Sequence, residues 1–236
     1  MLERYQANAS TPDRQALLEL LGQHYSEPIT SFIRRWAPSE REAEDLRQGF
    51  LARFIERDFL RQIRPERGSL RSFLKAAIRH YLLQDRRDGT AKKRQAPVKT
   101  ESIHDLPDAR QPETRWTQEM DRQFDREWKE HVVQRALKAI ERRHEESGSL
   151  KDFEAFVRYS VDPAFERAPR PTLKALARDV GTSEATLSRR FKSFSEQLKA
   201  AVRYLTRECS GSGRIADQEI AELFASGEFG VENWTE

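Results

Sequence analysis

The chain has 236 residues, 34% of them charged, and its formal net charge is +3. No apolar run approaches the length of about 20 residues that a membrane-spanning helix needs, and the N-terminus lacks the basic and apolar regions of a signal peptide. These properties argue against a membrane or secreted protein, and we expect a cytoplasmic one. Arg, Glu, Leu and Ala are abundant, which favours helices over sheets and predicts an all-α fold.

The residue types that act in catalysis or bind metals do not occur at the spacings that these functions need. The single cysteine, Cys209, cannot form an internal disulfide. The five histidines show no metal-ligand spacing: His24, His80, His104, His131 and His144. The sequence contains no carboxylate cluster with metal spacing and no activated serine or cysteine nucleophile. We therefore expect neither an enzyme nor a bound metal or cofactor.

Charge is unevenly distributed along the chain. Residues 1–90 carry a net +3, residues 91–130 are neutral, residues 131–206 carry +5 and the tail from 207 carries −5. Two mildly basic blocks therefore flank a neutral connector, and the chain ends in an acidic segment. This distribution suits contact with nucleic acid at two places, although mild basicity alone is weak evidence.

The first ninety residues predict a helical bundle. Residues 11–36 indicate two helices, with Pro28 in the first turn of the second, where proline is tolerated. A third helix begins at Ser39, a favoured capping residue. Its packing stripe contains Leu46, Phe50 and Phe54, and Asp45 and Gln48 lie on other faces, where a partner can reach them.

A basic surface is predicted around residues 61–87. The loop 61–69 contains Arg61, Arg64 and Arg67, and the helix after it buries a stripe formed by Leu70, Phe73, Leu74, Ala77, Ile78, Tyr81 and Leu82. Its other face is expected to expose Arg71, Lys75, Arg79, His80, Arg86 and Arg87. Such a face beside an arginine-rich loop suits single-stranded DNA, held through phosphates and stacking. The alternative is an ordinary solvated helix face.

A linker and a long helix follow. Residues 89–113 contain three prolines and no sustained apolar period, which predicts a flexible linker with a reach of about 85 Å when extended. From Glu113 a long helix carries apolar residues at three- and four-residue spacings: Trp116, Met120, Phe124, Trp128, Val132, Ala136 and Ile140. Another helix holds Phe153 and Phe156, and residues 161–171 form a loop.

Residues 172–202 predict a helix-turn-helix. A short helix ends at Gly181, whose backbone suits a sharp turn, and Ser183 caps a second helix. Leu187, Phe191, Phe194 and Leu198 form the packing stripe of that helix. Its outward residues are hydrogen-bond donors suited to phosphates and base edges: Thr186, Ser188, Arg189, Arg190, Lys192 and Ser193. Such a helix fits the major groove of DNA; an ordinary helical hairpin is the alternative.

The acidic tail contains a short amphipathic helix over residues 215–225. Three roles remain open for it. It folds back over the basic DNA-binding surface, meets a regulator, or packs on its own domain.

Three of these segments together resemble the sigma factors of bacterial RNA polymerase, in their short extracytoplasmic-function (ECF) group. EAEDLRQGFLARFIE at 42–56 is similar to the region-two signature, and GSLRSFLKAAIRHYLLQDRRD at 68–88 is similar to the helix that follows it. The helix-turn-helix resembles region four without gaps. The matching positions are Leu176, Ala177, Val180, Gly181, Ser183, Thr186, Leu187 and Arg190.

The resemblance implies two helical domains. Residues 1–88 would form a region-two bundle, 89–113 a flexible linker, 114–206 a region-four helix-turn-helix domain and 207–236 an acidic tail. The implied partners are core RNA polymerase, promoter DNA and a protein regulator such as an anti-sigma factor.

The resemblance also implies roles for individual residues. Glu44, Asp45, Gln48 and Phe50 would bind the polymerase. The minus-ten strand would meet Arg61, Arg64, Arg67, Arg71, Lys75, Arg79 and His80. The minus-thirty-five element would meet Ser183, Thr186, Ser188, Arg189, Arg190, Lys192 and Ser193.

Two other classes remain. A conventional helix-turn-helix repressor or activator explains residues 172–202, but leaves the first ninety residues unexplained and is usually a dimer on a palindrome. A DNA-processing enzyme such as a recombinase is the second class. This sequence shows neither the carboxylate cluster nor the activated nucleophile that such an enzyme needs.

Overall fold

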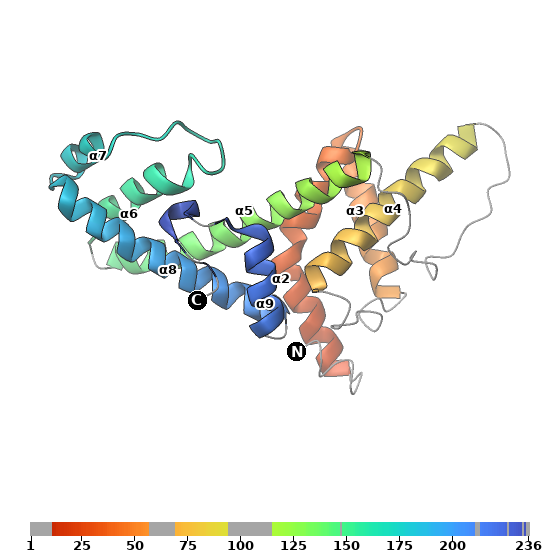
Figure 1. Ribbon diagram of the computed structural model, residues 1–236. Coiled ribbons are helices and arrows are strands. Elements are labelled where there is room, and N and C mark those ends of the chain that lie inside the picture. Colours follow the sequence, from red (N-terminus) through yellow and green to blue (C-terminus); the bar gives the residue numbers. More distant parts are fainter. Residues whose placement is uncertain are drawn as a thin grey trace. The chain divides into compact units, whose positions relative to one another are not determined.

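The computed structural model describes residues 11–56, 69–93, 115–146, 148–210, 213–225, 227–232 and 234. In these ranges every regular element is helical, which confirms the predicted all-α class (Figure 1). The elements include eight α-helices. No helix within them is long and apolar enough to cross a membrane. The chain divides into two compact units, Met1–Trp128 and Lys129–Glu236.

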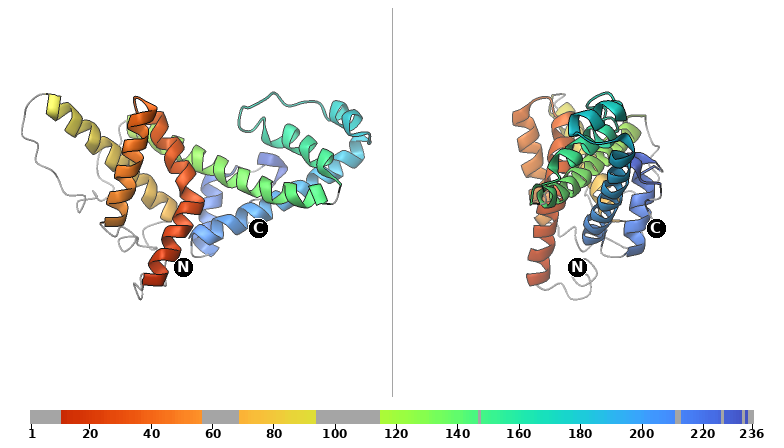
Figure 2. Two further views of the ribbon diagram at one scale, coloured as in Figure 1. Left: turned by 180° about the vertical axis from the view of Figure 1, so that it is seen from behind. Right: turned by 90° about the vertical axis from the view of Figure 1, so that its left-hand side faces the viewer.

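The first unit contains three helices and the beginning of a fourth: α2 (Thr11–Trp36), α3 (Glu40–Glu56), α4 (Leu70–Lys93) and α5 (Arg115–Glu146). Helices α2 and α3 run side by side (Figure 2). At the start of α3, the Ser39 hydroxyl oxygen accepts a hydrogen bond from the Glu42 backbone N–H at 3.3 Å, as expected for a capping serine.

Helix α2 is one continuous helix, so the expectation of two helices over residues 11–36 is wrong. Pro28 lies inside it. Although an internal proline removes a backbone hydrogen bond, Tyr25, Ile29, Phe32 and Ile33 on either side of Pro28 are all at most 3% exposed. Burial of both segments in one core outweighs the local cost of the proline.

Aromatic side chains dominate the core of the first unit. Phe32 meets Phe124 edge-on at 5.4 Å between ring centroids, and Phe50 contacts Tyr81 at 5.7 Å. Tyr25 lies against Trp128, with ring centroids 6.3 Å apart. The beginning of α5 is therefore packed into the bundle of α2 to α4.

The division between the units falls inside α5. The sequence interpretation assigned this whole helix to the second domain, whereas its residues up to Trp128 belong to the first compact unit. Helix α4 extends to Lys93, so the first five residues of the expected linker 89–113 are helical. The rest of that linker lies outside the described residues, and its role as a flexible tether stays a prediction.

The second unit contains the remainder of α5 and a series of shorter elements. These are α6 (Leu150–Phe156), the π-helical turn η3 (Val157–Val161), α7 (Leu173–Val180), α8 (Glu184–Ser210), α9 (Gly213–Leu223) and the 3₁₀ turn η4 (Glu228–Gly230). Its core is again aromatic. Phe194 contacts both Phe153 and Phe156 with ring centroids 5.6 Å apart, and His144 lies edge-on to Phe194 at 4.8 Å.

The described part of the acidic tail packs within the second unit. Asp217 of α9 pairs with Arg203 of α8 at 3.1 Å. Beyond α9, Phe229 is 2% exposed, and its carbonyl oxygen accepts a hydrogen bond from the Ser195 hydroxyl at 2.9 Å. Glu228 forms an ion pair with Lys129. Of the three roles left open for this segment, packing on its own domain is the one that these contacts match.

Candidate nucleic-acid and partner interfaces

Residues 172–202 form a tight helix-turn-helix from α7, the turn at Gly181 and the beginning of α8. The Thr172 hydroxyl oxygen accepts from the Ala175 N–H at 3.2 Å and caps α7. Gly181 ends α7 in the left-handed region, at φ 78° and ψ 37°. The Ser183 hydroxyl oxygen then accepts from the Thr186 N–H at 3.2 Å at the start of α8. Each end of the turn is therefore fixed by the residue type that the sequence predicts there.

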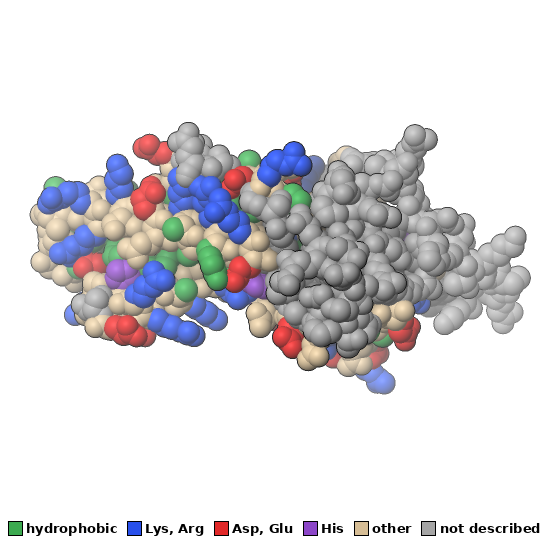
Figure 3. All heavy atoms as spheres, turned by 90° about the horizontal axis from the view of Figure 1, so that it is seen from below, with side chains coloured by type: hydrophobic (Ala, Val, Ile, Leu, Met, Phe, Trp, Pro, Cys, Tyr) green, Lys and Arg blue, Asp and Glu red, His purple; other side chains and the backbone are tan. Residues whose placement is uncertain are grey.

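Helix α8 has a buried stripe and an exposed face, as its periodicity predicts. Leu187, Phe191, Phe194 and Leu198 are at most 6% exposed. The opposite face exposes Ser188, Arg189, Arg190, Lys192 and Ser193, and Thr186 is half-buried. Figure 3 views the molecule from below and shows Lys and Arg side chains interspersed with acidic ones in its left-hand part. On the side drawn there, positive charge is local rather than uniform.

Two members of the predicted base-reading set have structural roles. Arg190 forms two hydrogen bonds to the Asp152 carboxylate of α6, at 2.6 and 2.8 Å, and so holds the start of α8 against α6. Ser183 is the helix cap, and its hydroxyl donates to the Thr186 hydroxyl oxygen at 2.9 Å. The exposed donors are then Ser188, Arg189, Lys192 and Ser193, on little more than one turn of α8.

On α3, three of the four predicted polymerase-binding residues are exposed: Glu44, Asp45 and Gln48. Hydrogen bonds from Arg47 and then from Gln48 lower the pKa of Glu44 from 4.5 to about 2, so this carboxyl stays ionised. The Gln48 amide donates to it at 2.7 Å. Phe50 differs, because it is 2% exposed in the aromatic core; its side chain supports α3 from within.

A cavity of about 330 Å³ lies beside Asp45. Its walls combine aromatic and apolar side chains with three carboxylates and one arginine: Trp36, Pro38, Leu46, Tyr81, Leu82, Glu42, Asp45, Asp85 and Arg86. The concave surface next to the predicted partner face of α3 is thus acidic.

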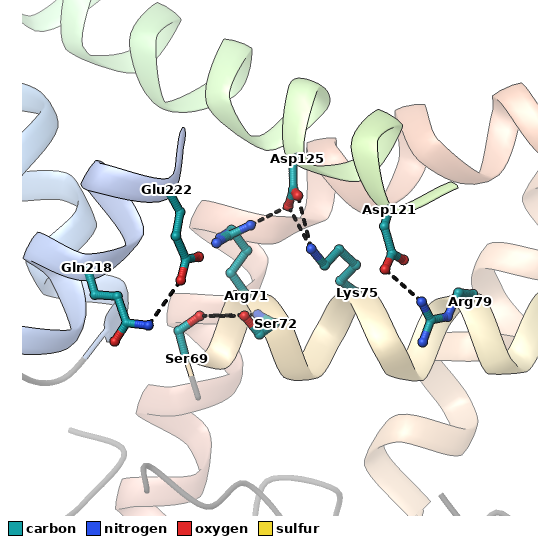
Figure 4. A network of polar contacts seen from close by, with 9 residues as sticks. All are labelled: Ser69, Arg71, Ser72, Lys75, Arg79, Asp121, Asp125, Gln218 and Glu222. Carbon is teal, nitrogen blue, oxygen red and sulfur yellow. Dashed lines mark hydrogen bonds and ion pairs between the residues drawn. The ribbon is translucent and has the colours of Figure 1, made fainter. Parts of the chain in front are cut away.

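Three of the predicted basic residues of α4 pair with carboxylates of α5, whereas Arg86 is exposed and the side chain of Arg87 lies outside the described residues. Arg71 pairs with Asp125 of α5, and the same carboxylate accepts from the Lys75 ammonium group at 2.9 Å (Figure 4). Arg79 donates to Asp121 at 2.7 Å. Arg71 is only 1% exposed, so the expectation that it lies on the outward face of α4 is wrong. The reason is that α5 covers this side of the helix.

The remaining predicted minus-ten residues give less information. His80 is half-buried on α4. Arg61, Arg64 and Arg67 lie outside the described residues. Within the part of the chain that is described, no group of three His, Cys, Asp or Glu side chains is arranged to hold a metal ion.

The sequence did not reveal the three carboxylates that pair with basic residues of α4 and α8. These are Asp121, Asp125 and Asp152. A signal existed for the first two. Asp121 and Asp125 are one helical turn apart, and each follows a residue of the apolar stripe of α5, Met120 or Phe124. Carboxylates at the edge of a packing stripe are placed to meet cations of a neighbouring helix.

Compared with protein-family models, with curated proteins and with solved structures, the chain finds no match in any of the three. The resemblance to a known class therefore depends on the motifs of the sequence itself.

Proposed function

We propose that this protein is an ECF-type sigma factor, which binds core RNA polymerase and directs promoter-specific initiation. The observation that carries the proposal is the helix-turn-helix at 172–202, whose second helix exposes Ser188, Arg189, Lys192 and Ser193. It is supported by a separate compact unit in which α3 exposes Asp45 and Gln48. A protein with these two surfaces is suited to join DNA to a large partner.

In this proposal the start of α8 reads the minus-thirty-five element in the major groove. Arg189 is the strongest candidate for base contact, since an arginine fork pairs with guanine through two hydrogen bonds. Lys192, Ser188 and Ser193 would bind phosphates or base edges. Arg190, through Asp152, would fix the angle at which α8 projects its exposed face.

Asp45 and Gln48 would dock on the polymerase. The acidic cavity beside Asp45 favours a partner surface with a positive charge there. Both side chains are exposed, so their role would be in association rather than in stability of the fold.

The minus-ten region would be opened jointly with the polymerase. Separating about ten base pairs costs on the order of 14 kcal/mol, at about 1.4 kcal/mol per step. Capture of one unpaired base returns about 1 to 3 kcal/mol. A protein of this size would therefore hold one or two bases with the surface near α4, while the polymerase holds the rest.

The test is transcription by purified core polymerase on a library of genomic fragments, with and without this protein. Defined start sites that appear only when the protein is added would support the proposal and would give the promoter sequence. Stable binding of the protein as a dimer to duplex DNA, without polymerase and without initiation, would instead favour a conventional helix-turn-helix regulator.

The role of Arg189 has its own test. Arg189→Ala is expected to weaken recognition of the upstream element by about 1 to 3 kcal/mol, measured as lost footprint protection there and lost initiation. Lys151→Ala is the matched control, because Lys151 is an exposed cation of α6 outside this face. Equal footprints for the two variants would remove Arg189 from the set of reading residues.

A further inference from the structure

The cavity beside Asp45 lies within the first unit and has charged groups on two helices. Its lining takes Glu42 and Asp45 from α3, and Asp85 and Arg86 from α4. Three carboxylates and one guanidinium leave the lining with an excess of two negative charges. A cation that enters the cavity therefore meets carboxylates from two separate elements.

Two of these carboxylates are available to a ligand. Glu42 accepts a hydrogen bond from the Ser39 hydroxyl at 2.9 Å at the beginning of α3. Asp45 and Asp85 are exposed, and among the described residues neither forms a hydrogen bond or an ion pair with another group. Each can accept hydrogen bonds from a cationic ligand without breaking a contact of the fold.

A buried hydroxyl belongs to the same lining. Tyr81 of α4 is 7% exposed, and within the described ranges its hydroxyl has no hydrogen-bond partner. Burial, the largest effect, raises the pKa of this hydroxyl, so it stays neutral at physiological pH and its oxygen can accept a hydrogen bond. Because buried polar groups are usually paired, this oxygen is a feature, separate from the carboxylates, that a ligand would satisfy.

The remaining lining is apolar or aromatic, and consists of Trp36, Pro38, Leu46 and Leu82. Such side chains bind methylene groups, because the contact removes apolar surface from water. The cavity volume of about 330 Å³ lies at the lower end of the range of about 300 to 1,000 Å³ for small-molecule sites. The cavity therefore suits a small molecule that combines an apolar part with positive charge.

A metal ion does not suit this lining. In the described part of the chain, no three His, Cys, Asp or Glu side chains are arranged to hold one. Glu42, Asp45 and Asp85 are therefore spread around the cavity rather than gathered at one point. A molecule with two separated positive groups matches this arrangement better than a single ion does.

We propose that this cavity binds a small aliphatic dication of the diamine or polyamine class. One ammonium group pairs with Asp45 on α3 and the other with Asp85 on α4, and the chain between them contacts Leu46 and Leu82. One of the two ammonium groups also donates a hydrogen bond to the Tyr81 hydroxyl oxygen. Charge-assisted hydrogen bonds are about twice as strong as neutral ones, so the two charged ends set the specificity.

Binding of the dication does not depend on the function proposed above, but one consequence of binding does. Asp45 is the side chain proposed to dock on core polymerase. A bound diamine and the polymerase would therefore compete for one carboxylate, and the concentration of the dication would set how much of the protein can associate. This consequence rests on the proposed function.

The first test is calorimetric titration of the full-length protein, without polymerase and at low salt. The probes are diaminopropane, putrescine, cadaverine and spermidine, and butylamine supplies a single ammonium group on a chain like that of putrescine. The best diamine should bind at least about tenfold more tightly than butylamine, since it makes an additional charge-assisted hydrogen bond. Affinity should also pass through an optimum with chain length, because α3 and α4 hold the two carboxylates at a fixed separation.

Variants identify the carboxylates. Asp45→Asn and Asp85→Asn should each weaken binding of the best diamine by about tenfold, and neither variant should prefer it to butylamine. The matched control, Glu56→Gln, removes the same charge from an exposed position of α3 outside the cavity and should bind as the wild type does. Tyr81→Phe removes only the hydroxyl oxygen and should weaken all of the diamines without changing the optimal length.

Weak binding that is independent of chain length, and equal in the Asp45→Asn, Asp85→Asn and Glu56→Gln proteins, would overturn the proposal. Nonspecific attraction to the acidic tail, which carries a net −5 from residue 207, would give that result. Circular dichroism and a urea transition establish that each variant is folded. Because the chain-length series uses the wild-type protein, the proposal can be refuted even if a variant does not fold.

The competition with polymerase has a separate test. Co-elution with core polymerase should fall when the best diamine is added, and should be unaffected by butylamine at the same concentration. Co-elution that persists at saturating diamine would refute the competition. A protein that initiates transcription but binds no diamine would refute the cavity site alone, whereas one that binds the diamine but never associates with polymerase would refute the sigma-factor function and leave the site intact.

Discussion

At Gly49 the backbone of α3 passes close to the ring of Tyr81 on α4. A Cβ atom added at this position would lie 2.4 Å from the Tyr81 hydroxyl oxygen. Tyr81 is 7% exposed and packs on Phe50, so its ring has little room to move. The glycine of the Gln48–Phe50 run therefore has a packing reason in this fold.

Gly49→Ala is expected to lower the free energy of unfolding by about 1 to 3 kcal/mol, because it overpacks this contact. In a Tyr81→Phe background the clashing oxygen is gone, and the same change should be neutral or stabilising by up to about 1 kcal/mol, through the higher helix propensity of alanine. Urea denaturation of the four proteins measures both values. A stabilising Gly49→Ala in the wild-type background would show that the ring gives way freely.

Asp121 makes stability depend on pH. Burial, the largest effect, raises its pKa above 3.8, so the native state holds this proton more tightly than the unfolded chain does. The resulting stabilisation is fully present below the unfolded-state pKa and is lost as the pH rises through the native value. Asp121→Asn removes this dependence, since the amide stays neutral.

The unfolding free energy of Asp121→Asn, minus that of the wild type, should therefore rise between about pH 3 and about pH 7. At neutral pH the variant should be at least as stable as the wild type. Urea midpoints at each pH measure the difference, with Glu119→Gln as an exposed control. If the Asn variant instead loses stability relative to the wild type as the pH rises, the Arg79 pairing outweighs the burial of the carboxylate.

At the scale of elements, the turn between α7 and α8 isolates a backbone effect. Neither Gly181 nor Gly22 of α2 would bring an added Cβ within 4 Å of another group, but Gly181 has φ +78°. Gly181→Ala should cost about 1 to 2 kcal/mol of stability, because a left-handed backbone is unfavourable for alanine. Gly22→Ala, inside a helix, should gain up to about 1 kcal/mol.

Thermal unfolding of the two alanine variants measures these opposite signs. A Gly181→Ala protein as stable as the wild type would mean that the turn relaxes to another conformation. The DNA binding proposed for α8 would then be expected to change, since this turn sets the direction of the helix.

Signals local in sequence predicted the elements well. The helix-turn-helix follows from Thr172, Gly181 and Ser183, each of which acts on its own few residues, and the buried stripe of α8 follows from its periodicity. Pro28 misled the interpretation because tertiary packing on both of its sides overrides a local cost. Arg71 misled it as well, since a helix pattern cannot reveal that another helix covers its polar face.

The sequence predicted some residues of the candidate sites correctly and others wrongly. The exposed donors of α8 and the exposed residues of α3 lie where their spacing implies. Phe50 and Arg190 make structural contacts instead. Phe50 packs in the aromatic core of the first unit, and Arg190 pairs with the carboxylate of Asp152. The pairing of α4 with Asp121 and Asp125 joins residues about fifty positions apart, and periodicity within one helix carries no information about it.

At the scale of the whole molecule, the proposed function requires two compact units that act on one large assembly. The first presents Asp45 and Gln48 on α3, and the second presents the α8 surface. Neither surface is large or strongly charged, and the net charge is only +3. In the proposed function, opening of DNA would therefore depend on the polymerase, so polymerase association is the central requirement of that function.

Co-elution with bacterial core RNA polymerase in size-exclusion chromatography tests that requirement most directly. The wild-type protein and a Glu56→Ala control are expected to co-elute with it. The Asp45→Ala, Gln48→Ala double variant should elute alone with an unchanged circular dichroism spectrum, because both side chains are exposed. Normal co-elution of the double variant would contradict the assignment of α3. Failure of the wild-type protein to co-elute would contradict the sigma-factor function itself.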